Sequence, residues 1–100
     1  MAWLERLVGD RIERYELRDV QNIVGRAQPA QILIRAPEVS RKHAEIIRVE
    51  GGYYLRDKGS QNGTLHNGSK IRHVYLRDGD VIRIGKVDLV FRDPSGPTSM

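Results

Sequence analysis

Short runs of apolar and β-branched residues, separated by polar turn residues, recur along most of this chain. From Ile12 onward the runs are bounded by Gly, Asn, Asp and Pro, which is typical of strands and turns. Near the end, Val87, Leu89 and Phe91 alternate with more polar neighbours, as in a strand with one buried side. The pattern predicts an all-β domain with strands at Ile12–Leu17, Gln21–Gly25, Gln31–Ile34, His43–Val49, Tyr53–Asp57, Ser69–Arg72, Val81–Ile84 and Val87–Arg92.

Four dipeptides carry the signal of a tight turn: Gly51-Gly52, Asn62-Gly63, Asn67-Gly68 and Asp78-Gly79. Gly and Asn tolerate the positive φ that tight hairpin turns require, so we expect Gly51-Gly52 to close a hairpin and the others to form similar turns. Many short strands in one small domain predict two packed antiparallel sheets, with loops gathered at the ends of the sandwich. Functional residues are then expected on those loops.

The two ends of the chain differ from this pattern. The apolar residues of segment 3–8 have the spacing of one or two amphipathic helical turns, and a strand or linker leading into the domain is the alternative. The last residues have the Pro, Ser and Gly composition of a linker. We therefore divide the chain into an N-terminal extension at 1–11, a β domain at 12–93 and a flexible tail at 94–100.

Composition narrows the functional classes. The 100 residues fit one domain that can form its own core. Without Cys, a disulfide framework and a thiolate metal site are excluded, and the three His residues lack the spacing of a metal pair. We expect no metal and no cofactor. No apolar run approaches membrane-spanning length and no signal peptide is evident, so we expect a cytoplasmic domain without membrane contact.

The net charge of +4 favours an anionic partner, which by charge alone is a phosphopeptide, a nucleic acid or an acidic lipid. Three polar clusters narrow the choice: Gly25-Arg26, Ser40-Arg41-Lys42-His43 and Ser60-Gln61-Asn62-Gly63-Thr64. Together they carry a guanidinium, hydroxyls and an amide. An Arg side chain donates paired hydrogen bonds to phosphate and stays charged, and a Ser hydroxyl adds a neutral donor. Three loops converging on one phosphate would explain the pattern.

The same clusters, followed by Asn67-Gly68 and by the segment 76–85, occur in an order that resembles a forkhead-associated (FHA) domain. The resemblance covers about Tyr15 to Arg92. It implies a SMAD-like β-sandwich of about eleven strands that binds phosphothreonine in a partner protein through loops at one end. It also implies that the chain has no catalytic activity and reads the substrates of a Ser/Thr kinase.

Residue roles follow from the resemblance. It implies that the phosphopeptide is contacted by Arg26, Ser40, Arg41 and Asn62. It implies that the loops are shaped by Gly25, His43, Gly63, Thr64 and Asn67. The residue types fit these roles, because a phosphate brings a charge of about −1.5 to −2 with three strong acceptors. An Asn side chain carries both a donor and an acceptor for a peptide main chain.

Three further residues are candidates for partner specificity. The resemblance places Glu38 toward the peptide segment just after the phosphothreonine, so we expect it to favour Lys or Arg at the third following position. Lys58 replaces the apolar residue common at its position in the family. Gln61 replaces the small hydroxyl residue that often precedes the Asn, which removes one side-chain contact to the peptide.

Three other functions are compatible with some of these residues and are judged by the rest of the sequence. Ser40, His43 and Asp57 have the residue types of a hydrolase triad, but the sequence lacks a nucleophile elbow and an oxyanion loop. A nucleic-acid-binding domain would use the basic surface, yet the six Phe, Trp and Tyr residues are scattered and most fit core positions, so we expect no nucleic acid. A phosphate-independent scaffold with the same fold is the third possibility.

Overall fold

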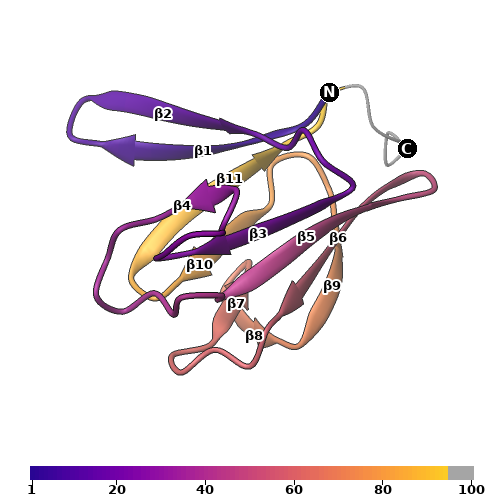
Figure 1. Cartoon of the computed structure of the whole chain (residues 1–100). Helices are drawn as coiled ribbons and strands as arrows, with labels where there is room; N and C mark the ends of the chain where they lie inside the picture. The colour runs from indigo at the N-terminus through magenta and orange to yellow at the C-terminus, as the bar shows by residue number, and fades with distance from the viewer. Residues whose placement is uncertain (95–100) are drawn as a thin grey trace.

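The computed structural model describes residues 1–94, which form two sheets packed face to face, with no helix in that range (Figure 1). The strands are β1 (Trp3–Val8), β2 (Arg11–Glu16), β3 (Gln21–Gly25), β4 (Ile32–Leu33), β5 (Ala44–Val49), β6 (Gly52–Asp57), β7 (Thr64–His66), β8 (Ser69–Ile71), β9 (His73–Leu76), β10 (Val81–Ile84) and β11 (Val87–Arg92). The predicted β-sandwich of about eleven strands is confirmed.

One sheet has six strands in the order β2-β1-β11-β10-β7-β8, and the other has five in the order β4-β3-β5-β6-β9. Neighbouring strands are antiparallel, with the exception of β4, which runs parallel to β3. The predicted antiparallel β-sandwich is confirmed, and the parallel β3–β4 pair is a local exception at the edge of the five-stranded sheet. The segment after β3 loops round and returns in the same direction, with only two residues in the ladder.

Alternating apolar side chains from both sheets fill the space between them. Leu89 and Phe91 on β11 are buried, as are Ile46 on β5 and Leu55 on β6. The ring of Tyr53 meets Phe91 edge-on across the two sheets, with centroids 5.6 Å apart. Each such side chain contributes about 1.5–3 kcal/mol by leaving water, so the core holds the two sheets together.

The helical interpretation of the N-terminal segment is wrong, because residues Trp3–Val8 form strand β1. Leu4 is fully buried and pairs with Tyr15 on one side and Phe91 on the other. Leu7, four positions from Trp3 on a helix, is instead 71% exposed. β1 pairs with β11 only over its first three residues, so the rest of the β1–β2 hairpin projects beyond the sandwich (Figure 1).

Two turns differ from their predicted form. The β5–β6 hairpin turns at Glu50-Gly51 rather than Gly51-Gly52, because Val49 pairs with Gly52 and only Gly51 of the two glycines has a positive φ. Asp78-Gly79 does form a turn, with Asp80 N donating to Arg77 O, but it links β9 to β10 in the other sheet. A turn that links strands of different sheets is distinguished from a hairpin only by which strands pair in the structure.

The short strands β7 and β9 are absent from the predicted set. The predicted strand Ser69–Arg72 ends at Ile71, and Arg72 carries the chain from β8 in one sheet to β9 in the other. Other predicted strands agree with the structure to within one or two residues at each end. The expectation of a flexible tail falls, apart from Pro94, outside the described residues.

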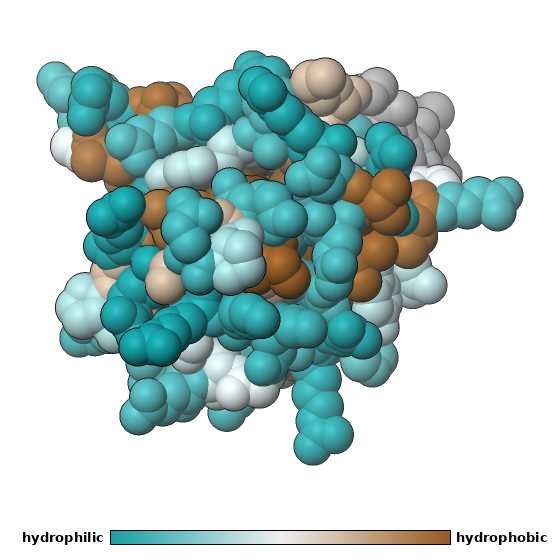
Figure 2. Space-filling view, in the orientation of Figure 1, coloured by the Kyte–Doolittle hydropathy of each residue, from teal (hydrophilic) through white to brown (hydrophobic). Residues whose placement is uncertain are grey.

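The surface is mostly hydrophilic in the view of Figure 2. Apolar atoms gather at the tip of the β1–β2 hairpin, where Leu7 and Ile12 pair and are exposed (Figure 2). The loops that carry the predicted functional clusters join β3 to β4, β4 to β5 and β6 to β7.

Candidate functional site

Ser40 lies where these three loops meet. Its carbonyl accepts a hydrogen bond from Arg26 N at 3.0 Å, which ties it to the first loop. Its Oγ accepts one from Gln61 N at 3.1 Å, which ties it to the third. The predicted convergence of the three clusters is therefore present in the structure.

A glycine at the end of β3 makes this convergence possible. A Cβ on Gly25 would lie 1.8 Å from the carbonyl oxygen of Arg41, far inside van der Waals contact. The second loop can therefore lie directly against β3, and His43 N donates to Val24 O at 2.9 Å. Close backbone approach, rather than an unusual φ, is what requires a glycine here.

Arg26 follows Gly25 directly and is exposed. Its Nε donates to Val39 O at 2.8 Å, which fixes the guanidinium against the second loop. One nitrogen is used in this way, and the two terminal amino groups remain for a ligand. An Arg held by Nε and open at its ends is suited to an anion that accepts two parallel hydrogen bonds.

His43 is fully buried and braces the site. Ser40 N donates to its Nδ1 at 3.0 Å, so Nδ1 carries no proton and Nε2–H donates to Gly63 O at 2.8 Å. The ring thus links the second loop to the third. Its hydrogen bonds run to backbone groups on both sides, as expected of a structural His.

Asn62 and Glu38 meet beside Ser40. Asn62 Nδ2 donates to Glu38 O at 2.7 Å, so one of its two amide hydrogens is used inside the protein. The other hydrogen and Oδ1 remain on an exposed side chain. Glu38 in turn lies against the β10–β11 turn, where a Cβ on Gly85 would be 2.9 Å from Glu38 O. Arg41 is exposed next to Ser40.

Asp57 organises the third loop, a role that the sequence analysis missed. Its Oδ1 accepts hydrogen bonds from Ser60 Oγ at 2.6 Å and Thr64 Oγ1 at 2.7 Å, and Oδ2 accepts them from Gly59 N and Ser60 N. Ser60 Oγ then accepts from Gly63 N at 3.0 Å. The Asp-x-Gly-Ser sequence is typical of a turn in which Asp accepts from nearby backbone N–H groups, and was the available signal.

These bonds also set the charge state of Asp57. Burial alone would raise the pKa of the Asp57 carboxyl. The hydrogen bonds from Ser60, Thr64 and Gly59 lower this pKa by a larger amount. The net pKa therefore lies below its usual value, and Asp57 is ionised at neutral pH. A partly buried carboxylate with four donors is a structural centre for the loop.

Lys58 lies beside the site through its backbone, since Lys58 N donates to His43 O at 2.9 Å. Its ammonium is 3.9 Å from Oε1 of the fully buried Glu45, which also pairs with Arg56 and accepts from Gln21. Burial alone would raise the pKa of Glu45, but these three partners lower it by a larger amount, so the net pKa lies below its usual value. The Glu45 carboxylate therefore balances part of the charge of Lys58. Gln61, the third candidate for specificity, has an exposed side chain.

Comparison with known proteins decides the family. A family model described as the FHA domain matches residues 22–85. The chain belongs to the FHA domain family. FhaA of Mycobacterium tuberculosis, an FHA domain-containing protein, is 43% identical over 79 residues, which cover 78% of this chain and 15% of FhaA.

Solved FHA domains have the same fold. The FhaA FHA domain complexed with the intracellular domain of Rv3910 has a TM-score of 0.85 and 37% identity, covering 92% of this chain and 100% of that one. An FHA domain solved for the analysis of phosphothreonine-dependent FHA domain interactions has a TM-score of 0.83 and 36% identity, covering 97% and 98%. The chain spans 8% of the length of one curated relative, an ABC transporter ATP-binding/permease protein of Mycobacterium tuberculosis, and 57% of another, the oxoglutarate dehydrogenase inhibitor of Corynebacterium jeikeium.

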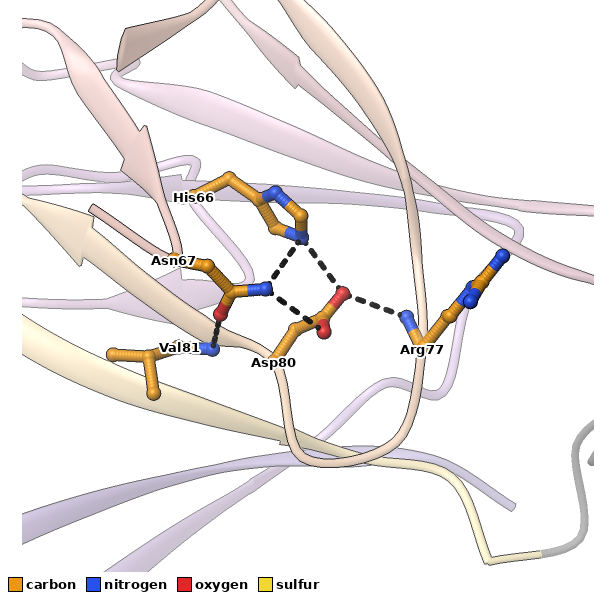
Figure 3. A network of polar contacts seen from close by, with 5 residues as sticks. All are labelled: His66, Asn67, Arg77, Asp80 and Val81. Atoms are coloured by element: carbon orange, nitrogen blue, oxygen red, sulfur yellow. Dashed lines mark hydrogen bonds and ion pairs between the residues drawn. The ribbon is translucent and has the colours of Figure 1, made fainter. Parts of the chain in front are cut away.

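Asn67 belongs to a separate network of this FHA domain (Figure 3). With a φ of 49° it forms the β7–β8 turn, and its Oδ1 accepts from Val81 N at 2.8 Å. Asp80 accepts from Asn67, from Arg77 N and from His66 Nε2, the last at 2.7 Å. Burial alone would raise the pKa of Asp80, but these hydrogen bonds lower it by a larger amount, so the net pKa lies below its usual value. The network joins two turns and does not extend to Ser40.

The geometry of the FHA domain separates the residues of the supposed hydrolase triad. His43 bonds to the backbone N of Ser40 rather than to its Oγ, and Asp57 bonds to Ser60 and Thr64. Within residues 1–94, no group of three His, Cys, Asp or Glu side chains is placed to hold a metal ion. No helix in that range is long and apolar enough to cross a membrane.

The expectation that the aromatic residues are scattered is wrong for two of them. Tyr54 and Tyr75 pair across β6 and β9, with centroids 4.9 Å apart and planes at 62°. His73 stacks on Tyr54 at 5.6 Å, and Tyr75 is 69% exposed. Tyr53 and Phe91 are core residues, as expected. A small aromatic surface therefore exists on the five-stranded sheet.

Proposed function

We propose that this FHA domain is a phosphothreonine-dependent interaction module that binds partner proteins phosphorylated by a Ser/Thr kinase, and that it has no catalytic activity of its own. The observation that supports this best is the position of Ser40, which hydrogen bonds to all three loops. The guanidinium of Arg26 is held beside it. Structurally similar FHA domains include one solved for the analysis of phosphothreonine-dependent interactions.

The donors fit a phosphate group. Arg26 offers two terminal amino groups, because Val39 O uses only Nε. The Oγ lone pair of Ser40 accepts from Gln61 N, which leaves the hydroxyl hydrogen to donate to a phosphate oxygen. Arg41 adds a further donor from its backbone or side chain. The Arg26 guanidinium, the Ser40 hydroxyl and the Arg41 donor together match the three acceptor oxygens of a phosphothreonine.

Asn62 then holds the peptide main chain. Its Oδ1 accepts from a peptide N–H, while the amide hydrogen not used by Glu38 O donates to a peptide carbonyl. Both contacts are with backbone groups, so they secure a peptide of any sequence. In this proposal His43, Gly25, Gly63 and Thr64 only position the contacting residues.

Sequence preference comes from the neighbouring charges. We expect the Glu38 carboxylate to favour Lys or Arg at the third position after the phosphothreonine. An exposed ion pair of this kind contributes about 0–1 kcal/mol, which makes it a selector between peptides rather than a source of affinity. Lys58 contributes less than its charge indicates, because Glu45 is 3.9 Å away.

A degenerate peptide library with one fixed phosphothreonine tests the function. We expect the domain to retain phosphorylated peptides and to release the same library after phosphatase treatment. Equal retention before and after treatment would identify a phosphate-independent scaffold and contradict the proposal. Absence of Lys and Arg enrichment at the third following position would remove the role of Glu38 alone.

Nucleic acid is the competing ligand, since the aromatic surface of Tyr54, His73 and Tyr75 offers rings for stacking. Random oligonucleotides should bind weakly if the proposal is right. Tight binding that falls steeply with salt would favour the alternative.

We further expect the domain to act in the cytoplasm, where ATP-dependent kinases phosphorylate their substrates.

A further inference from the structure

The side chain of Lys70 crosses the loop that carries Asn62. Lys70 lies on β8, the edge strand of the six-stranded sheet, and pairs with Leu65 in the β7–β8 hairpin. A Cβ on Gly63 would lie 3.0 Å from its Cε and 3.7 Å from its Nζ. The lysine stem thus lies against Gly63, which has no side chain, and its ammonium ends close to the same residue.

The ammonium of Lys70 has no carboxylate within ion-pair distance among residues 1–94. Lys58, which begins the β6–β7 loop, lies 3.9 Å from Glu45 Oε1. Lys58 was the cation that the sequence indicated for specificity. Lys70 is exposed and, unlike Lys58, has no such carboxylate beside it in the described part of the chain.

Lys70 is also within reach of a peptide held at Ser40. One imidazole ring and two hydrogen bonds, of 3.0 and 2.8 Å, separate Ser40 N from Gly63 O. That span is about two to three residues of an extended peptide, which advances roughly 3.3 Å per residue. Glu38 and Lys70 approach Asn62-Gly63 from different elements and carry opposite charges.

From this geometry we propose that Lys70 is a specificity residue that selects an acidic side chain, Asp or Glu, two to four residues from the phosphothreonine of the partner. The inference rests on the proposed function, because it needs a peptide bound across Ser40 and Asn62. The preferred peptide then carries a phosphothreonine with a basic residue toward Glu38 and an acidic residue toward Lys70.

The test compares the wild type with Lys70→Glu and Lys70→Met on a phosphothreonine library. We expect the wild type to enrich Asp and Glu about two- to five-fold at one position near the phosphothreonine, as an exposed ion pair allows. Lys70→Met keeps most of the stem over Gly63 and should lose this enrichment while retaining phosphopeptides. Lys70→Glu should enrich Lys and Arg at the same position, because the charge is reversed.

Arg48→Glu is the charge-matched control. Arg48 is exposed at the far end of β5 from His43, so its reversal should leave the library profile unchanged. Identical profiles for the wild type and both Lys70 variants would overturn the inference while leaving the proposed function intact. A wild type that retains phosphorylated and unphosphorylated peptides equally would instead refute the proposed function itself. Unfolding midpoints verify that each variant is folded.

Discussion

Gly25 shows how a single residue sets the site. The carbonyl of Arg41 occupies the space that any side chain at position 25 would need. Arg26 N can then reach Ser40 O at 3.0 Å, and the two loops that carry Arg26 and Ser40 come together. The Gly-Arg dipeptide in the sequence therefore has two separate functions, close approach from the first residue and charge from the second.

Replacing Gly25 by Ala should destabilise the fold by about 3 kcal/mol, because a backbone clash forces the second loop or β3 to move. Gly52→Ala is the matched control. Its Cβ would meet nothing within 4 Å and its φ is not positive, so its stability should change by less than about 1 kcal/mol. Urea unfolding measures both variants, and equal stabilities would contradict the account of Gly25.

The convergence of the clusters that carry Arg26, Ser40 and Asn62 could be predicted, because each cluster has its own recognisable local motif. Lys70 could not, since its proximity to Gly63 depends on the β7–β8 hairpin folding back along the loop. For the same reason the sequence could not show that Glu45, a residue of β5, balances the charge of Lys58.

At the level of elements, the β6–β7 loop is held by Asp57 through side-chain and backbone donors. The alternation of apolar and polar residues was enough to predict β11. The pattern failed for β1, where an exposed Leu7 imitates helical spacing, and for the short β7 and β9. Each of these three strands also pairs with a strand distant in the sequence, β1 with β11, β7 with β10 and β9 with β6, and local patterns do not report such pairing.

Asp57→Asn should lower the free energy of unfolding at pH 7 by about 1.5–3 kcal/mol, since Asn turns one acceptor oxygen into a donor group facing N–H donors. The pKa of folded Asp57 lies below that of the unfolded chain, about 3.9. Its stabilisation is therefore complete above that value and is lost as the pH falls through the folded pKa.

Urea unfolding of the wild type and Asp57→Asn at several pH values measures this. The difference between the two proteins should be largest near neutral pH and should shrink below pH of about 4, as the wild-type carboxyl becomes protonated. A constant difference across the range would show that the carboxylate charge is not what stabilises the loop.

For the whole molecule, β1 lies between β2 and β11 in the six-stranded sheet, and so extends the domain into a segment that the sequence analysis assigned to an N-terminal extension. Ala2 and Leu4 are fully buried, and Leu17 N donates to Ala2 O at 3.1 Å. The family model matches residues 22–85 and so leaves out β1, β2 and β11. We propose that the folding unit includes β1, although the binding loops all lie inside the matched range.

Two leucines on β1 test this boundary. Leu4→Ala should cost about 2–5 kcal/mol, as for a fully buried leucine. Leu7→Ala, on the projecting part of the same strand and 71% exposed, should cost less than about 0.5 kcal/mol. Similar small losses for both variants in chemical unfolding would mean that β1 is not part of the cooperative unit.

One titration tests the central proposal most directly. A phosphothreonine peptide selected from the library, and its unphosphorylated form, are titrated into the wild type and Arg26→Ala, with Arg48→Ala as control. We predict binding only to the phosphorylated peptide, weakened about 10- to 150-fold by Arg26→Ala through the loss of charged hydrogen bonds and unchanged by Arg48→Ala. Equal affinity for the two peptides, or unchanged binding by a folded Arg26→Ala variant, would contradict it.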